Sequence, residues 1–241
     1  MRFLGTIAAL VLLSAPLQAS RPAFSVDGSL KLSSAYLWRG DYVCGLHFNP
    51  DVCFHIGNFT VENYDFLSLD GQYKEIDWDL SWKLGDFTLH LADYYARYAS
   101  YEMPESFFSW KMGQTNHIDE VALVYDCPAF PLTAKWFTFF WGDWAYEEVS
   151  GTPVGVSFSS YLELETWYDA GKWGKGVLNL GASVFKGAYT GYTKGFMPVH
   201  IELRYEKEFG LGEIQLPLGV SFMVNPYNRC CYAAAWAGIA F

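Results

Sequence analysis

Apolar and polar side chains alternate strictly from Glu75 to Lys83. Successive side chains of a β-strand point to opposite faces, so this segment predicts a strand with one apolar and one polar face. The apolar face comprises Ile76, Trp78, Leu80 and Trp82. The polar face comprises Glu75, Asp77, Asp79, Ser81 and Lys83.

Alternation of this kind, or strand-rich composition, recurs in about twelve segments: 28–39, 51–57, 58–69, 73–84, 86–98, 117–126, 131–141, 155–169, 174–186, 198–209, 213–224 and 231–241. The second half of the chain contributes further members of the apolar face, namely Ile201, Leu203, Leu216, Leu218 and Val220. So many short alternating segments predict an all-β protein.

The joins between these segments differ in length in a regular way. Short, mostly glycine-bearing joins occur at 57–58, 85–86, 127–130, 170–173 and 210–212. The joins between them are mostly longer, at 40–50, 99–116, 142–154, 187–197 and 225–230, with 70–72 as the exception. Short turns at one end and long loops at the other are typical of a transmembrane antiparallel up-and-down β-barrel, here of about 12 strands. Greek-key connections would mix the two ends.

The first 19 residues have the pattern of a secretory signal peptide. Arg2 supplies a positive charge, an apolar run follows from Leu4 to Leu13, and Ala19 is a small residue suited to cleavage. The run is too short to span a bilayer as a helix. We therefore expect residues 1–19 to be a signal peptide, with cleavage after Ala19 or alternatively Ser20, and residues 20–241 to form an outer-membrane barrel of a Gram-negative bacterium.

Composition supports contact with lipid. Hydrophobic residues make up 51% of the chain and aromatic residues 19%, whereas only 17% are charged. One core of this size does not easily hide so many aromatic side chains, and Trp and Tyr gather at the interfaces of membrane barrels. The net charge of −10 argues against nucleic acid as a partner, because phosphate binding needs basic patches. An acidic lumen would favour cations.

The inward faces of the expected strands collect charged side chains. The candidates for the lumen wall are Arg39, Glu75, Asp77, Asp79, Lys83, His90, Asp93, Arg97, Glu120, Glu163, Glu165, Glu202, Arg204 and Glu206. These residues fit a pore lined with mixed charges. They fit equally a set of ion pairs that fills a narrow barrel, since buried charges are normally paired.

Two segments depart from strict alternation. Continuing the pattern from Phe87 to Leu91 would place Asp93 in lipid, so we expect a bulge around Ala92 that turns Asp93, Tyr95 and Arg97 inward and Tyr94 and Tyr98 outward. The segment 133–141 is apolar on both faces, and we expect Trp136 and Phe140 to point into the lumen.

The sequence offers little for catalysis or cofactor binding. There is no Gly-x-Ser-x-Gly motif, and the rim residues His117 and Asp119 are of a kind that is usually just solvated. Asp77 and Asp79 could hold a metal ion, although such pairs more often meet basic groups across a strand. We expect no catalytic residue, no metal and no cofactor. The pairing of the five cysteines, Cys44, Cys53, Cys127, Cys230 and Cys231, stays open, with Cys44–Cys53 one option.

The C-terminal Phe241 ends an alternating strand and resembles the signal read by the bacterial barrel-assembly machinery. The chain also resembles the TorF-type porins, a family of small bacterial outer-membrane barrels. The resemblance rests on Ser33–Gly40, Tyr73–Asp77 and Tyr94–Tyr98, in the N-terminal part of the barrel. It implies an outer-membrane barrel with a porin-like role.

Together these observations predict an outer-membrane channel for passive diffusion of small polar solutes, weakly favouring cations and embedded in outer-membrane lipid. The main alternative is a plugged barrel with a structural or adhesive role. A soluble secreted barrel that binds a lipid and an outer-membrane enzyme that modifies lipid are further alternatives.

Overall fold

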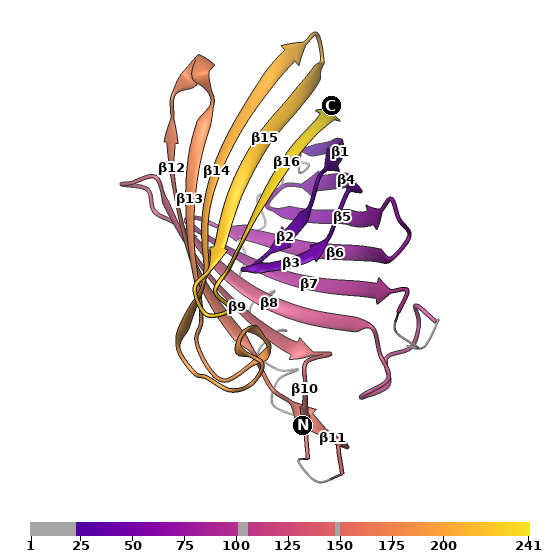
Figure 1. Cartoon of the computed structure of the whole chain (residues 1–241). Helices are drawn as coiled ribbons and strands as arrows, with labels where there is room; N and C mark the ends of the chain where they lie inside the picture. Colours follow the sequence, from indigo (N-terminus) through magenta and orange to yellow (C-terminus); the bar gives the residue numbers. More distant parts are fainter. Residues whose placement is uncertain (1–22, 101–105, 148–149) are drawn as a thin grey trace.

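Twelve antiparallel strands form one closed barrel in the computed structural model, which describes residues 23–100, 106–147 and 150–241 (Figure 1). In order around the wall the strands are β1 (Phe24–Ser33), β4 (His47–Ile56), β5 (Phe59–Ser68), β6 (Tyr73–Leu84), β7 (Phe87–Tyr98), β8 (His117–Asp126), β9 (Leu132–Trp141), β12 (Ser160–Asp169), β13 (Lys175–Ser183), β14 (Met197–Leu211), β15 (Ile214–Asn225) and β16 (Cys230–Ala240). β16 pairs with β1 and closes the wall. The predicted all-β barrel of about twelve strands is confirmed. The expected signal peptide, residues 1–19, lies outside the described residues.

Short elements occupy the connections. The hairpin of β2 (Tyr36–Trp38) and β3 (Asp41–Cys44) lies within the outline of the barrel, whereas β10 (Trp144–Tyr146) and β11 (Pro153–Val156) extend past one end (Figure 1). Two 3-10 turns, η1 (Gly171–Trp173) and η2 (Ala188–Thr190), complete the set. Residues 36–38 therefore belong to a separate hairpin and do not continue the first wall strand. No helix in the described residues is long and apolar enough to cross a membrane.

The connections sort by length between the two ends of the barrel. One end, here called the turn end, carries residues 57–58, 85–86, 127–131, 170–174 and 212–213. The other, the loop end, carries 34–46, 69–72, 99–116, 142–159, 184–196 and 226–229. This arrangement matches the one that the join lengths predicted.

The outer face carries a continuous apolar band. Val61, Leu80, Leu91 and Val121 are successive Cα partners on β5 to β8, so their side chains lie side by side on this face. All nine residues that we expected to face lipid share it. Six of them are exposed, namely Trp78, Leu80, Ile201, Leu203, Leu218 and Val220. The other three, Ile76, Trp82 and Leu216, are partly exposed.

Aromatic rings cover glycines at several places in the wall. A Cβ on Gly219 would come within 2.0 Å of the Trp236 ring, and one on Gly181 would come within 1.9 Å of the Tyr161 hydroxyl. The ring of Phe241 lies in the same way against Gly28, and the two residues exchange backbone hydrogen bonds of 3.0 Å. The terminal phenylalanine is therefore built into the seam between β1 and β16.

The expected bulge at Ala92 is wrong. β7 pairs regularly with β6 through this region, with Ala92 opposite Asp79 and Asp93 opposite Trp78. Asp93 and Arg97 therefore share the outer face, whereas Tyr94 points into the barrel. A carboxylate is tolerated outside because Asp93 accepts a 2.8 Å bond from the His117 ring.

Irregular pairing occurs elsewhere, opposite Asp119 and Glu120 and opposite Gly181 and Ala182. In the first case Phe140 of β9 has no Cα partner on β8, and in the second Val199 of β14 has none on β13. These two bulges lie near the loop end, where they bend the wall strands.

The expected inward placement of Trp136 and Phe140 is also wrong. Both are exposed on the outer face. The inward aromatic residues of β9 are Phe137 and Phe139, because Lys135 is directed inward by its ion pair with Glu163 and fixes the alternation of the strand.

Candidate functional site

The centre of the barrel holds an arginine that comes from a loop. Arg39 lies at the tip of the β2–β3 hairpin and is 8% exposed. Its Nη1 lies 2.5 Å from Oε2 of Glu120 on β8, and its Nη2 lies 2.8 Å from Oε1. Nη1 also donates to the Tyr189 hydroxyl at 2.5 Å. A two-pronged arginine–carboxylate pair of this kind is strong and directional.

Aromatic rings surround this guanidinium and form what we call the closure layer, which comprises Trp38, Arg39, Phe137, Phe139, Tyr161 and Tyr189. The guanidinium carbon lies 4.0 Å from the ring centroid of Phe137 and 4.7 Å from that of Trp38. A buried cation against ring faces gains electrostatic attraction. The layer draws on β9, β12 and two loops, and it obstructs the lumen.

The hairpin tip is wedged against the far wall. Arg39 and Gly40 both have left-handed backbones, with φ of 47° and 98°. A Cβ on Gly40 would lie 2.1 Å from the carbonyl oxygen of Val199, the bulged residue of β14. Only glycine fits this approach and this conformation without strain. The tip therefore reaches from the β1 side of the barrel to β8 and β14.

A second loop supports the layer from the loop end. The backbone amide of Ala188, next to Tyr189, donates a 2.7 Å hydrogen bond to Oγ of Ser159. Tyr192 donates a hydrogen bond to the Asp143 carboxylate. Burial, followed by this bond, raises the pKa of Tyr192 above its ordinary range, so the hydroxyl keeps its proton. Residues 184–196 are thus fastened to the neighbouring loop 142–159.

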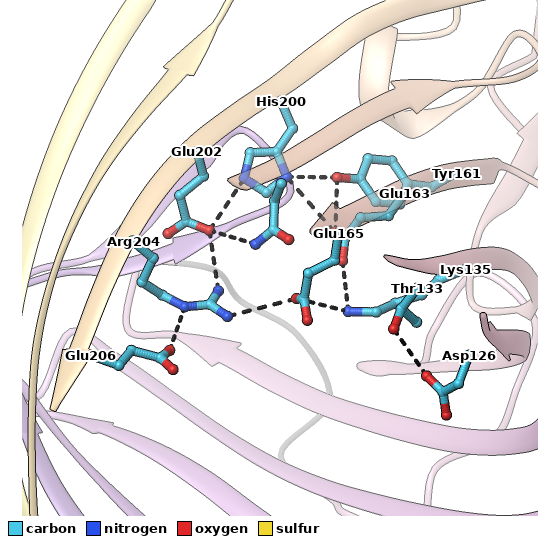
Figure 2. A network of polar contacts seen from close by, with 11 residues as sticks. Asp126, Thr133, Lys135, Tyr161, Glu163, Glu165, His200, Glu202, Arg204 and Glu206 are labelled. Atoms are coloured by element: carbon cyan, nitrogen blue, oxygen red, sulfur yellow. Dashed lines mark hydrogen bonds and ion pairs between the residues drawn. The ribbon is translucent and has the colours of Figure 1, made fainter. Parts of the chain in front are cut away.

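One side of the wall carries an alternating set of charges, the charge ladder, formed by Lys135, Glu163, Glu165, His200, Glu202, Arg204 and Glu206 (Figure 2). Lys135 Nζ lies 2.9 Å from Glu163 and 3.2 Å from Glu165. Arg204 lies 2.5 Å from Glu206, 3.4 Å from Glu202 and 3.7 Å from Glu165. Every carboxylate of the ladder therefore has a cationic or histidine neighbour.

His200 connects the charge ladder to the closure layer (Figure 2). Its Nδ1 lies 2.7 Å from the hydroxyl of Tyr161, and its Nε2 lies 3.6 Å from Glu202. The Tyr161 ring in turn lies beneath the Arg39 guanidinium, at 5.0 Å. A chain of polar and aromatic contacts thus runs from the wall of β14 to the hairpin tip.

The opposite wall carries acids that are mostly unpaired. Asp51, Glu62 and Asp79, here called the acidic wall, line a cavity of about 450 Å³ that also contacts Lys31. Asp79 lies 3.0 Å from His90. In the described part of the chain, neither Asp51 nor Glu62 has a cation within ion-pair distance. This side of the lumen is therefore net negative.

The remaining sequence candidates lie apart from this cavity. Glu75 is buried toward the loop end and accepts a 2.6 Å bond from the Tyr73 hydroxyl. Asp77 is 0% exposed, and its carboxylate has no hydrogen-bond partner among the described residues. Lys83 lies exposed at the turn end. The candidates of the ladder, with Asp79, His90 and Glu120, do meet inside the barrel.

Sequence reasoning missed Lys31, Asp51 and Glu62 as lumen residues. The signal was weak because β5 carries Asn63 and Asp65 on its outer face, so polar residues occur on both faces and alternation is lost near the loop end. The register resolves this, since Glu62 lies opposite Asp79 and shares its face.

Two further cavities have other linings. One of about 320 Å³ shares Lys31 and Asn49 with the first and extends to Arg204 and Trp236. Another of about 390 Å³ lies at the loop end, where Arg97, Tyr98 and Trp144 line it. Of the closure layer, Phe137 lines the 450 Å³ cavity, and none of its residues lines the other two.

Potential metal ligands converge at one place in the described residues. One ligand atom each of Asp51, Cys53 and Glu62 lie within 4.8 Å of one another. Asp77 and Asp79 do not form such a group. The five cysteines, all of them described, are free thiols, so Cys44 and Cys53 are not bridged.

The His117–Asp93 pair is enclosed by aromatic and backbone contacts. The second ring nitrogen of His117 lies 2.5 Å from the carbonyl oxygen of Phe107, and the Trp110 ring stacks on the imidazole at 3.9 Å. With both nitrogens occupied and both ring faces in contact, this histidine serves packing on the outer face.

No protein-family model and no curated protein matches the chain. Solved structures of similar architecture include an outer-membrane channel from Pseudomonas putida F1, with 11% identity over 94% of this chain and 98% of that one and a TM-score of 0.46. The CymD monoaromatic hydrocarbon channel has 7% identity, coverage of 92% and 88%, and a TM-score of 0.41. Salmonella typhi OmpF, solved with daunomycin, has 7% identity, coverage of 91% and 97%, and a TM-score of 0.38.

Proposed function

We propose that this chain is an outer-membrane channel for small polar solutes with a weak preference for cations, and that residues 1–19 direct its export. The observation that carries the proposal is the 450 Å³ cavity inside a closed barrel, bordered by the acidic wall on one side and by Lys135 of the charge ladder on the other. A barrel with a purely structural role has no need of unpaired carboxylates around an open volume.

The outer surface supports a membrane location. Large apolar side chains are exposed around the whole barrel, which would be unfavourable in water and suits hydrocarbon. In hydrocarbon every backbone donor and acceptor must be paired, and the closed strand order satisfies this requirement. We propose lipid as the partner of this surface, and the assembly machinery as the partner of the seam that ends at Phe241.

The preference for cations follows from the charges that lack partners. Lys135 and Arg204 are neutralised by ladder carboxylates, and Arg39 by Glu120. The acidic wall contributes three carboxylates, those of Asp51, Glu62 and Asp79. The basic side chains near them in the same cavity are Lys31 and His90. A low-dielectric wall focuses this negative potential in the lumen, which raises the local concentration of cations.

Ion currents through a planar bilayer test this function. Under a KCl gradient we expect stepwise currents whose reversal potential lies on the potassium side. The Glu62→Gln/Asp79→Asn variant should move the reversal potential toward zero, whereas Glu213→Gln, in an exposed turn, should leave it unchanged. Currents that favour chloride in the wild type would contradict the cation preference.

The closure layer favours a second candidate, a barrel that is permanently plugged. Its six residues obstruct the lumen, and the bond between Arg39 and Glu120 is buried. A plugged barrel gives no current steps in the wild type or in any variant that displaces the hairpin tip, so the same recordings separate the two functions.

A further inference from the structure

We propose that the β2–β3 hairpin is a gate, in which the tip residues Trp38, Arg39 and Gly40 close the lumen and withdraw to open it. This inference rests on the proposed channel function and adds its regulation. The tip crosses the barrel and places Arg39 against Glu120 and Phe137, which both line the 450 Å³ cavity beside the acidic wall. Its withdrawal would uncover this end of the cavity.

The root of the hairpin is attached to the wall through its backbone. Backbone hydrogen bonds fasten its base, from Ser34 to Ala235 at 2.9 Å and from Leu69 to Leu46 at 2.9 Å. Tyr36 stacks on Phe66 of β5 with centroids 3.7 Å apart, which fixes the root of β2. The root is therefore part of the wall and can serve as a hinge.

The tip is held differently, by side chains. Arg39 bonds to Glu120 and Tyr189, and Trp38 packs between Phe139 and Tyr189. In the described part of the chain, no backbone hydrogen bond joins residues 38–40 to a wall strand. Release of the tip thus leaves the backbone hydrogen bonds between the wall strands intact, so the gate can move without unfolding the wall.

The tip has a backbone conformation that depends on its contacts. Arg39 has a left-handed backbone, which a residue with a Cβ rarely adopts unless its surroundings impose it. The surroundings here are the bond to Glu120 and the fit of Gly40 against Val199. Loss of either contact frees the backbone of Arg39 to leave this conformation, and the two contacts therefore act as one latch.

The latch connects the tip to a carboxylate of the lumen. Glu120 lines the 450 Å³ cavity, and it also accepts a 2.9 Å bond from Tyr94. When Arg39 leaves, the Glu120 carboxylate joins the exposed acids of the lumen and keeps Tyr94 as a donor. The open state therefore gains one more carboxylate without a cationic partner on the wall of this cavity.

Gly40→Ala tests the gate without altering any charge. The new Cβ would overlap the Val199 carbonyl, so the tip cannot seat. Gly71→Ala is the matched control, because Gly71 also has positive φ, 71°, and lies at the loop end, but has no atom within 4 Å of the Cβ position. Heat-modifiable electrophoretic mobility shows that each variant is folded. Tyr189→Phe, which removes only the hydroxyl that Arg39 contacts, is the second variant should Gly40→Ala not fold.

We expect single-channel recordings in KCl to show at least a several-fold higher open probability for Gly40→Ala and Tyr189→Phe than for wild type and Gly71→Ala. Equal open probability and conductance in all four proteins would overturn the gate and leave the channel function standing. Absence of current in all four would overturn the channel function itself.

Discussion

Lys135 on β9 lies directly opposite Glu163 on β12, and its Nζ also reaches Glu165 two residues further along the same strand, so that one amine neutralises two carboxylates (Figure 2). Cα partners share a face, and side chains two apart on a strand also share it. The strand register thus places one amine between two carboxylates, and the net charge of the lumen depends on this contact.

Lys135→Met should leave both carboxylates without their amine. We expect the reversal potential to shift further toward that of potassium, because the lumen gains net negative charge. Unfolding free energy should fall by about 1–3 kcal/mol, since two partly buried acceptors lose a charged donor. Recordings in a KCl gradient and denaturant titration in detergent measure the two effects.

Lys172→Met is the control, because Lys172 lies exposed in the η1 turn. It should alter neither quantity. The double variant Lys135→Met/Glu163→Gln should recover part of the lost stability, and strict additivity of the two single changes would argue that the pair does not interact.

Leu80→Arg and Ser81→Arg test the assignment of the two faces at adjacent positions. Leu80 lies in the apolar band and Ser81 faces the lumen beside His90. Arginine near the middle of the lipid face costs roughly 2–4 kcal/mol, whereas lumen positions tolerate charge. The free energy of folding into phospholipid vesicles, measured by tryptophan fluorescence, should therefore become much less favourable in Leu80→Arg and only slightly less favourable in Ser81→Arg. Equal losses would contradict the assigned faces.

Gly219→Ala should destabilise the barrel because Trp236 lies over the glycine. The added methyl would meet the ring at 2.0 Å and force it to shift. Overpacking of this kind costs about 1–3 kcal/mol. Gly176→Ala is the matched strand control, since its Cβ would meet nothing within 4 Å, and it should be neutral or stabilising. Thermal unfolding of the two variants in the same detergent decides between these outcomes.

Cys53 offers a test of access to the lumen. Its side chain lies beside Asp51 and Glu62, both of which line the 450 Å³ cavity. In a variant with the other four cysteines changed to serine, a methanethiosulfonate reagent carrying a positive charge should label Cys53 and reduce the single-channel current. The cysteine-free protein should not respond. Labelling of Cys53 without any change in current would show that ions do not pass this wall.

The barrel and its two faces could be predicted because they depend on local information. Alternation marks the strand from Glu75 to Lys83, and the lengths of the joins mark the two ends. The same local pattern misled at Ala92, where a charge on the outer face suggested a bulge. Asp93 is stabilised there by His117, which lies 24 residues along the chain, and alternation cannot reveal such a partner.

The periodicity of apolar residues could not predict the closure of the lumen, for the same reason. Arg39 was expected on a wall strand, yet it meets Glu120, 81 residues away, and Tyr189, 150 residues away. The fit of Gly40 against Val199 depends on a bulge in β14, where its pairing with β13 shifts by one residue. Contacts between loops and distant strands are set by the assembled wall, so the sequence indicated a charged lumen without showing where it is blocked.

The most direct test of the account is a single-channel recording of the purified wild-type protein in a planar bilayer with a KCl gradient. The account predicts discrete current steps whose reversal potential favours potassium, with closed intervals that shorten in Gly40→Ala. A bilayer that contains folded wild-type and Gly40→Ala protein and yet shows no steps above background would contradict it.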